Sequence, residues 1–74
     1  MILYHRIDDP ESAAVRRRVV ELAIKPQVDF QNVDTEGAEA FAQHGGRNVP
    51  ALWDGRRLHE GGAAVLAELE SLRR

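Results

Sequence analysis

Cysteine is absent from all 74 residues of the sequence. Its absence excludes a disulfide, a thiolate nucleophile and a zinc–thiolate site, and it fits a compartment on either side of a membrane. Long apolar runs are missing too. The opening "MILYHRIDDP" meets charges after a few residues, unlike a signal peptide, and no segment approaches the roughly 20 apolar residues of a membrane span. We therefore expect a cytoplasmic protein with no membrane partner.

An excess of basic residues is also missing. The net charge is −2, whereas nucleic-acid-binding domains usually carry a basic surface. The one basic run, residues 16–18, falls inside a helical pattern and is predicted to be part of a solvated helix face. No nucleic-acid partner is expected. The length predicts a single domain, 1–74, and the arginine- and alanine-rich composition is typical of GC-rich bacterial genomes.

The first helix is predicted to follow a strand at residues 2–7, where β-branched and aromatic residues gather. Asp9 is the expected N-cap, Pro10 suits the first helical position, and Glu11 favours the positive end of the helix dipole. Lys25-Pro26 is expected to stop the helix. The apolar residues that recur at helical spacing are Ala14, Val15, Val19, Leu22 and Ala23.

The rest of the chain predicts a strand, a helix, a hairpin and a last helix. Residues 28–33 alternate like a strand. Asp34 or Thr35 is the expected cap of a helix that ends at Gly45-Gly46, and Asp54-Gly55 predicts a two-residue hairpin turn. The last helix is predicted to open at Gly61-Gly62 and to carry an apolar stripe of Val65, Leu66, Leu69 and Leu72.

The predicted order is therefore β-α-β-α-β-β-α. Two strands that flank a helix should be parallel, joined by a right-handed crossover. The hairpin must add antiparallel strands to the same sheet. We predict an α/β domain with a mixed four-stranded sheet covered by helices.

Three quoted segments carry a resemblance to known families. "LYHRIDDPESAAVRRRVVEL" is similar to the glutaredoxin segment built on Leu-Tyr-Ser, Cys-Pro-Tyr-Cys and a basic amphipathic helix. "GGRNVPALWDG" resembles the stretch that carries a cis-proline, and "LHEGGAAVLAEL" resembles the transferase Glu-Ser-x-Ala-Ile and the glutaredoxin Gly-Gly-Cys-Asp-Asp. The whole chain thus resembles glutaredoxins and the N-terminal domain of glutathione transferases. The resemblance implies a minimal thioredoxin (glutaredoxin-like) fold, with helices on both faces of the sheet.

The departure from these families lies at the first motif. Asp9 stands in the place of the nucleophilic cysteine and Ser12 in the place of the resolving one, while Pro10 is retained. A helix N-terminus stabilises a carboxylate as it stabilises a thiolate, but a carboxylate cannot exchange disulfides. We therefore predict a redox-inactive protein with no catalytic residue, in which Asp9, Pro10, Glu11 and Ser12 form a vestigial active-site turn.

The resemblance also implies where a ligand would bind. In these families the Val49-Pro50 bond would be cis, and Val49 would offer its backbone to an extended peptide. The N–H groups at Gly61-Gly62 would hold the γ-glutamyl carboxylate of glutathione. A strand-start proline and a simple glycine turn are the alternatives at these two places. The candidate residues for glutathione or peptide binding are Arg6, Arg47, Val49, Pro50, Glu60, Gly61 and Gly62.

Two other functions stay open. The first is a stand-alone glutathione transferase-like enzyme, in which Ser12 or Tyr4 would stabilise the thiolate, although it would lack that family's helical second domain. The second is a protein-interaction module with no small ligand, using the sheet edge or residues 16–18. Ser12 is more simply a residue whose hydroxyl bonds the backbone, and Tyr4 a sheet residue. Glutathione is a possible ligand, and no cofactor is expected.

The three histidines, His5, His44 and His59, show no metal-ligand spacing along the sequence. No carboxylate is expected to orient any of them, so no metal site is predicted. His5 is the one that borders the vestigial turn. Trp53, the only tryptophan, is predicted to be partly buried against the sheet.

Overall fold

The structure, a computed structural model, describes residues 1–72, so the last two residues of the predicted domain, 1–74, lie outside the described residues. The predicted order of strands and helices is confirmed, with one short 3₁₀ turn in addition. The elements are β1 (Ile2–His5), α1 (Pro10–Glu21), η1 (Lys25–Gln27), β2 (Asp29–Asn32), α2 (Ala38–Gln43), β3 (Ala51–Trp53), β4 (Leu58–Glu60) and α3 (Gly62–Ser71).

The four strands form one mixed sheet in the order β2-β1-β3-β4. β1 pairs with β2 in parallel and with β3 antiparallel, and β3 pairs antiparallel with β4. This is the pairing predicted from a crossover helix followed by a hairpin. Leu3 in β1 lies opposite Leu52 in β3, and Tyr4 lies opposite Ala51. Neighbouring side chains of a strand point to opposite faces of the sheet. The Leu3–Leu52 pair therefore packs in the layer on one face, and the Tyr4–Ala51 pair packs in the layer on the other.

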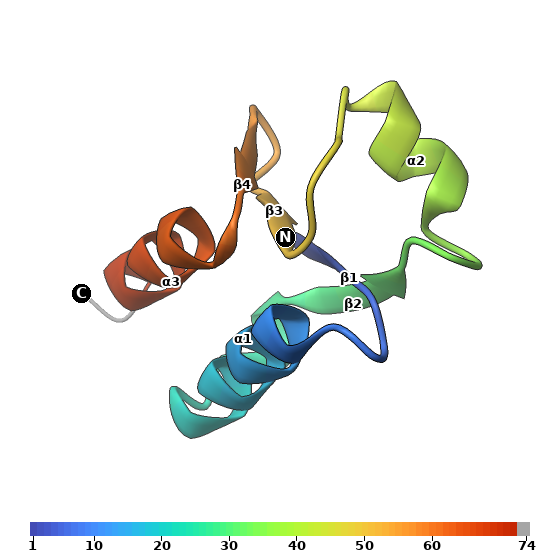
Figure 1. The fold of residues 1–74 in the computed structure, drawn as a ribbon. Coiled ribbons are helices and arrows are strands. Elements are labelled where there is room, and N and C mark those ends of the chain that lie inside the picture. Colours follow the sequence, from blue (N-terminus) through green and yellow to red (C-terminus); the bar gives the residue numbers. More distant parts are fainter. Residues whose placement is uncertain (73–74) are drawn as a thin grey trace.

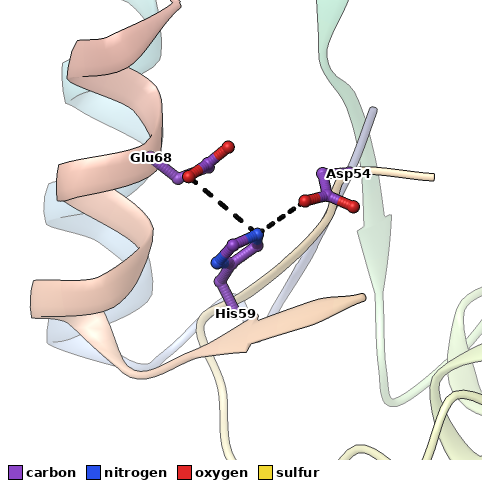
Figure 2. Close-up of side chains that lie close together, drawn as sticks. All are labelled: Asp54, His59 and Glu68. Atoms are coloured by element: carbon purple, nitrogen blue, oxygen red, sulfur yellow. Dashed lines mark hydrogen bonds and ion pairs between the residues drawn. The ribbon is translucent and has the colours of Figure 1, made fainter. Parts of the chain in front are cut away.

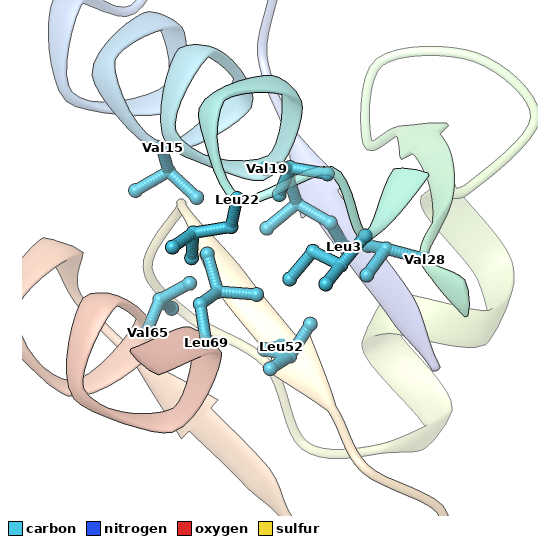
Figure 3. Close-up of a cluster of buried hydrophobic side chains, with 9 residues drawn as sticks. Leu3, Val15, Val19, Leu22, Val28, Leu52, Val65 and Leu69 are labelled. Carbon is cyan, nitrogen blue, oxygen red and sulfur yellow. The ribbon is translucent and has the colours of Figure 1, made fainter. Parts of the chain in front are cut away.

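Helices cover both faces of the sheet (Figure 1). α1 and α3 lie side by side on one face, where aliphatic side chains of both helices meet Leu3 and Leu52 (Figure 3). α2 lies on the other face, over Tyr4 and Ala51. The molecule is thus a compact α/β domain with three helices in its described residues.

Helix α1 begins as predicted and ends earlier than predicted. It stops at Glu21, because Ala23 adopts a left-handed backbone conformation (φ 59°) and the N–H of Ile24 returns to the carbonyl of Val19, which closes the helix C-terminus. Pro26 lies beyond the helix end, in the turn η1. Two residues of the predicted apolar face, Ala14 and Ala23, are exposed, and the buried positions of α1 are Ser12, Val15 and Val19.

The predicted cap of the second helix is wrong. Helix α2 starts only at Ala38, after Gly37, and has no side-chain cap. The carboxylate of Asp34 is engaged with Arg6 instead, and the N–H of Asp34 donates to the side chain of Asn32. Thr35 also precedes the helix, with its hydroxyl on Glu36. The predicted end is confirmed, since α2 stops at Gln43 and Gly45 follows with φ 78°.

The hairpin loop is longer than predicted. Trp53 pairs with Leu58, so the loop has the four residues 54–57 instead of two. One carboxylate oxygen of Asp54 accepts the N–H groups of Arg56 and Arg57 at 2.7 and 2.9 Å. This side-chain turn, with Gly55 at φ 99°, opens the loop beyond a two-residue connection. The predicted stripe of α3 is confirmed for Val65 and Leu69, which are buried, while Leu66 and Leu72 pack against them partly exposed.

Candidate functional site

The turn at the start of α1 is a fully bonded helix cap. Asp9 has an extended backbone, and its carboxylate accepts the N–H of Ser12 at 2.8 Å. The buried Ser12 hydroxyl donates to the same oxygen at 2.7 Å and accepts the N–H of Arg6 at 3.2 Å. The predictions of Asp9 as N-cap and Pro10 as first helical residue are confirmed. The two hydrogen bonds from Ser12, its hydroxyl first, hold the pKa of Asp9 below its usual range, so this carboxylate is not a proton donor near neutral pH.

Glu11 links the starts of two helices. Its carboxylate accepts the N–H of Gly62, the first residue of α3, at 2.6 Å. A Cβ at position 62 would lie 2.7 Å from the Glu11 oxygen, so the Glu11 side chain would have to shift. The sequence analysis missed this contact, since 51 positions separate the two residues. A carboxylate of the protein itself therefore occupies the helix N-terminus that was predicted to receive the carboxylate of glutathione.

The Val49-Pro50 bond is cis, as predicted. Pro50 is buried, and its carbonyl accepts the N–H of Gly61 at 2.8 Å. Val49 is partly buried, and within residues 1–72 neither its N–H nor its C=O has a hydrogen-bond partner. Together, the bonds Pro50–Gly61 and Glu11–Gly62 bring the three predicted motifs to one place at the starts of α1 and α3.

The remaining candidate residues are engaged differently. Glu60 accepts the N–H groups of Arg47 and Asn48 at 2.7 and 3.0 Å, and these bonds lower the pKa of its carboxyl group. The carboxylate thus fixes the loop that leads into Val49-Pro50. The Arg47 side chain is exposed. The guanidinium of Arg6 binds Asp34 with an Nε–Oδ2 distance of 3.1 Å, so Arg6 is not an unpaired cation.

His5, next to the turn, is buried and bound to Arg16. The His5 Nδ1 lies 2.9 Å from the Arg16 guanidinium, which also donates to the carbonyls of Arg6 and Ile7. Since a guanidinium only donates, Nδ1 accepts. Burial, and then the charge of Arg16, lower the pKa of His5. The predicted solvated face is confirmed in part: Arg17 is exposed and Arg16 and Arg18 are partly exposed, while Arg16 bonds His5 and Arg18 pairs with Glu21 and Glu70.

A second cluster of ionisable side chains lies between the hairpin and α3 (Figure 2). His59 in β4 has its Nε2 2.8 Å from the Oδ2 of Asp54 and 4.0 Å from a carboxylate oxygen of Glu68 in α3. The hydrogen bond from His59, followed by those from Arg57 and Arg56, strongly lowers the pKa of Asp54. The prediction that no carboxylate orients a histidine is therefore wrong for His59. Its partners approach from separate elements, which the sequence spacing did not reveal.

Two surface hollows lie away from the predicted site. One, of about 420 Å³, is lined by Met1 and residues 25–29. The other, of about 280 Å³, is lined by Asp54, Arg56 and Arg57, next to the His59 cluster. None of the predicted glutathione- or peptide-binding residues lines either hollow.

Compared with known proteins, the chain matches no family model, no curated protein and no solved structure. None of the helices within residues 1–72 has the length and apolar character needed to cross a membrane.

Proposed function

We propose that this chain has the thioredoxin fold in its glutaredoxin-like form and acts as a redox-inactive domain that binds an extended peptide segment along the backbone of Val49. The sheet order β2-β1-β3-β4, with one parallel pair and helices on both faces, supports the fold. The three predicted motifs lie together at the starts of α1 and α3, which supports the location of the proposed binding site.

The unpaired backbone of Val49 carries the proposal. An N–H and a C=O without a hydrogen-bond partner among residues 1–72 can form two main-chain hydrogen bonds with a ligand in extended conformation, as in strand addition. The flanking segments are fixed by Glu60 on one side and by the Pro50–Gly61 bond on the other. A rigid frame around two free polar groups lowers the entropic cost of binding.

Glu11 favours a peptide over glutathione. Its carboxylate holds the Gly62 N–H at 2.6 Å, where the family resemblance implies that the γ-glutamyl carboxylate would bind. Glutathione would have to displace a charged group of the same sign. A peptide segment that uses only the Val49 backbone has no such competitor.

The transferase alternative is disfavoured by two hydroxyl groups. The Ser12 hydroxyl is buried and donates to Asp9. The Tyr4 side chain has no exposed surface. Neither is presented to a thiol of a bound ligand, so neither supplies the hydrogen bond with which those enzymes stabilise a thiolate.

Amide hydrogen exchange tests the peptide site directly. Peptides selected from a random heptapeptide phage library on the immobilised protein would be synthesised and added to the ¹⁵N-labelled chain. We expect the Val49 amide to exchange fast in the free protein and to be protected in the complex, while Ala51, already in the sheet, changes little. Binding that leaves Val49 unprotected, or a library that yields no binder, would contradict the proposal.

A cysteine variant tests whether the turn at Asp9 is a vestigial active-site turn. In Asp9→Cys the thiolate would receive the Ser12 N–H and hydroxyl at the helix start, so its pKa should fall below the free value of about 8.5. The pH dependence of alkylation by iodoacetamide measures it. Asp8→Cys is the matched control, because Asp8 is exposed and makes no hydrogen bond within residues 1–72. Equal thiol pKa values in the two variants would count against a vestigial thioredoxin-like site.

A further inference from the structure

In the cluster of Asp54, His59 and Glu68, one histidine nitrogen faces two carboxylates and can form a hydrogen bond with only one of them. The Nε2 of His59 carries at most one hydrogen, and the 2.8 Å bond to Asp54 uses it. Glu68 faces the same nitrogen at 4.0 Å, beyond hydrogen-bond range. Within residues 1–72 the Glu68 carboxylate has no closer partner. Two carboxylates therefore converge on one imidazole nitrogen, and only one of them is bonded.

We propose that Asp54, His59 and Glu68 bind a divalent transition-metal cation, with Zn²⁺ as the best-suited ion. Each residue offers one ligand atom, and the three atoms lie within 4.8 Å of one another. Ligand atoms around a tetrahedral zinc, at bond lengths of about 2.0–2.1 Å, lie roughly 3.3 Å apart. The observed 2.8 and 4.0 Å fall on either side of that spacing. Binding would require the Asp54 oxygen to move outward, the Glu68 oxygen to move inward, and the His59 Nε2 to give up its hydrogen, with the ring then carrying its hydrogen on Nδ1.

The three ligands come from three elements that pack together. Asp54 lies in the hairpin loop, His59 in β4 and Glu68 in the middle of α3 (Figure 2). Their side chains are only 17, 12 and 30% exposed. Partial burial keeps the ligands ordered and reduces competition from water. A metal bound there would also tie the hairpin to α3.

Asp54 is oriented for this role before any ion arrives. Its Oδ1 accepts the N–H groups of Arg56 and Arg57, so its Oδ2 remains free to face His59. Such outer hydrogen bonds fix the direction of metal-binding carboxylates in proteins. The Oδ1 of Asp54 thus stabilises the loop, and its Oδ2 is directed at the proposed metal site.

The ligand set indicates the class of metal. One imidazole nitrogen and two carboxylate oxygens suit Zn²⁺ and its transition-metal neighbours, whereas Ca²⁺ and Mg²⁺ prefer oxygen ligands alone. Three protein ligands leave a fourth position for water or a small anion. The hollow of about 280 Å³ lined by Asp54, Arg56 and Arg57 shares Asp54 with the proposed site.

The experiment is a titration of the 74-residue chain with ZnCl₂ at pH 7.5, followed by isothermal calorimetry and by the melting temperature, with MgCl₂ in parallel. We expect one Zn²⁺ per chain, a higher melting temperature and no response to Mg²⁺. His59→Gln and Glu68→Gln should each weaken Zn²⁺ binding by tenfold or more. Glu68→Gln is the safer variant for folding, since its 4.0 Å contact is the weakest of the cluster. Circular dichroism checks that both fold.

Glu70→Gln is the matched control. Glu70 lies on the same helix but pairs with Arg18, and its loss should leave Zn²⁺ binding unchanged. Zn²⁺ binding that persists in both His59→Gln and Glu68→Gln would place the ion elsewhere and overturn the proposal. Absence of binding at 100-fold excess Zn²⁺ would overturn it too, leaving the cluster as a hydrogen-bonded tie between the hairpin and α3.

Discussion

The two faces of the sheet are packed in different ways. Under α1 and α3 the buried side chains are aliphatic and almost fully inaccessible (Figure 3). Under α2 the fully or nearly buried residues are fewer, namely Tyr4, Val33 and Ala51, and the layer is completed by partly exposed groups such as Phe41 and Trp53. Partly exposed apolar side chains flank both layers, but fully buried residues are more numerous under α1 and α3.

The helices on the two faces also differ, in length and in capping. α1 and α3 have 12 and 10 residues, and α1 is capped by Asp9. α2 has six residues and no side-chain cap, so it is too short to be stable by itself. Aromatic contacts hold it: Phe41 lies 5.3 Å from the Tyr4 ring, and His44 stacks on Trp53 at 3.7 Å. The larger buried cluster and the longer helices thus lie on the first face, which we expect to supply most of the stability.

The proposed peptide site belongs to the second face. Val49 packs in the cluster under α2, in the segment that leads from α2 into β3. A ligand that adds hydrogen bonds to Val49 therefore contacts the layer that has fewer buried residues. The proposed metal site lies by contrast beside α3, the helix that contributes Val65 and Leu69 to the larger buried cluster.

The largest expected effect comes from opening a cavity in the aliphatic face. Leu69 is fully buried, and Leu69→Ala should cost about 2–5 kcal/mol of unfolding free energy. For a domain of this length that is a large share of a total of roughly 4–11 kcal/mol. Phe41→Ala, on the other face, should cost only roughly 1–2 kcal/mol despite the larger side chain, because the ring is partly exposed. Urea unfolding measures the unfolding free energy of both variants. Equal losses of stability would contradict the proposed difference between the two faces.

The next effect concerns the N-cap residue of α1, Asp9. Asp9→Ala removes the acceptor for the Ser12 N–H and hydroxyl, so the melting temperature should fall by roughly 4–8 °C. Asp8→Ala, its exposed neighbour, should leave it within a degree or two. If both substitutions have the same effect, the cap does not contribute to the stability of α1.

The same carboxylate should contribute to acid sensitivity. The pKa of Asp9 is lower in the folded chain than the unfolded value of about 3.9. Its contribution to stability is therefore fully present above pH 4 and is lost as the pH falls through the lower, folded pKa. Asn caps a helix about as well as Asp but does not titrate. Melting temperatures between pH 6 and 2 should thus fall less steeply for Asp9→Asn than for the wild type, and parallel curves would contradict this.

Local features of the fold were predictable from the sequence. The Asp9-Pro10 helix start and the turn at Gly45 depend on backbone preferences of a few adjacent residues, so the pattern alone indicates them. The start of α2 was not predictable in this way. Asp34 has the right chemistry for a cap, but Arg6, which is distant in the sequence, binds its carboxylate.

At the candidate sites, too, contacts between distant residues were harder to predict than local features. The family resemblance drew attention to Asp9, Pro50 and Gly61. The Gly61 N–H bonds the Pro50 carbonyl, and Glu11, from the same turn as Asp9, bonds the N–H of Gly62. The contacts of Glu11 with Gly62 and of Glu68 with His59 join separate elements whose relative positions depend on packing. No spacing in the chain encodes these contacts. Sequence reasoning therefore identified the turn and missed both the Glu11 carboxylate at the start of α3 and the cluster of Asp54, His59 and Glu68.

The smallest expected effect has the opposite sign and is the most specific to the α2 face. The Tyr4 side chain is fully buried, and within residues 1–72 its hydroxyl has no hydrogen-bond partner. Burial, and then the charge of Asp29, raise the pKa of this hydroxyl, so it stays neutral. A buried neutral hydroxyl without a partner costs free energy that the unfolded chain, solvated by water, does not lose.

Tyr4→Phe removes this oxygen and keeps the ring against Phe41. We expect the unfolding free energy to rise by up to about 1 kcal/mol, measured by urea unfolding beside Leu69→Ala. Removing atoms from the aliphatic face only opens a cavity, whereas removing this atom relieves a desolvated polar group. A loss of stability in Tyr4→Phe would mean that the hydroxyl is hydrogen-bonded in solution, and that water reaches under α2 more deeply than the packing of this face indicates.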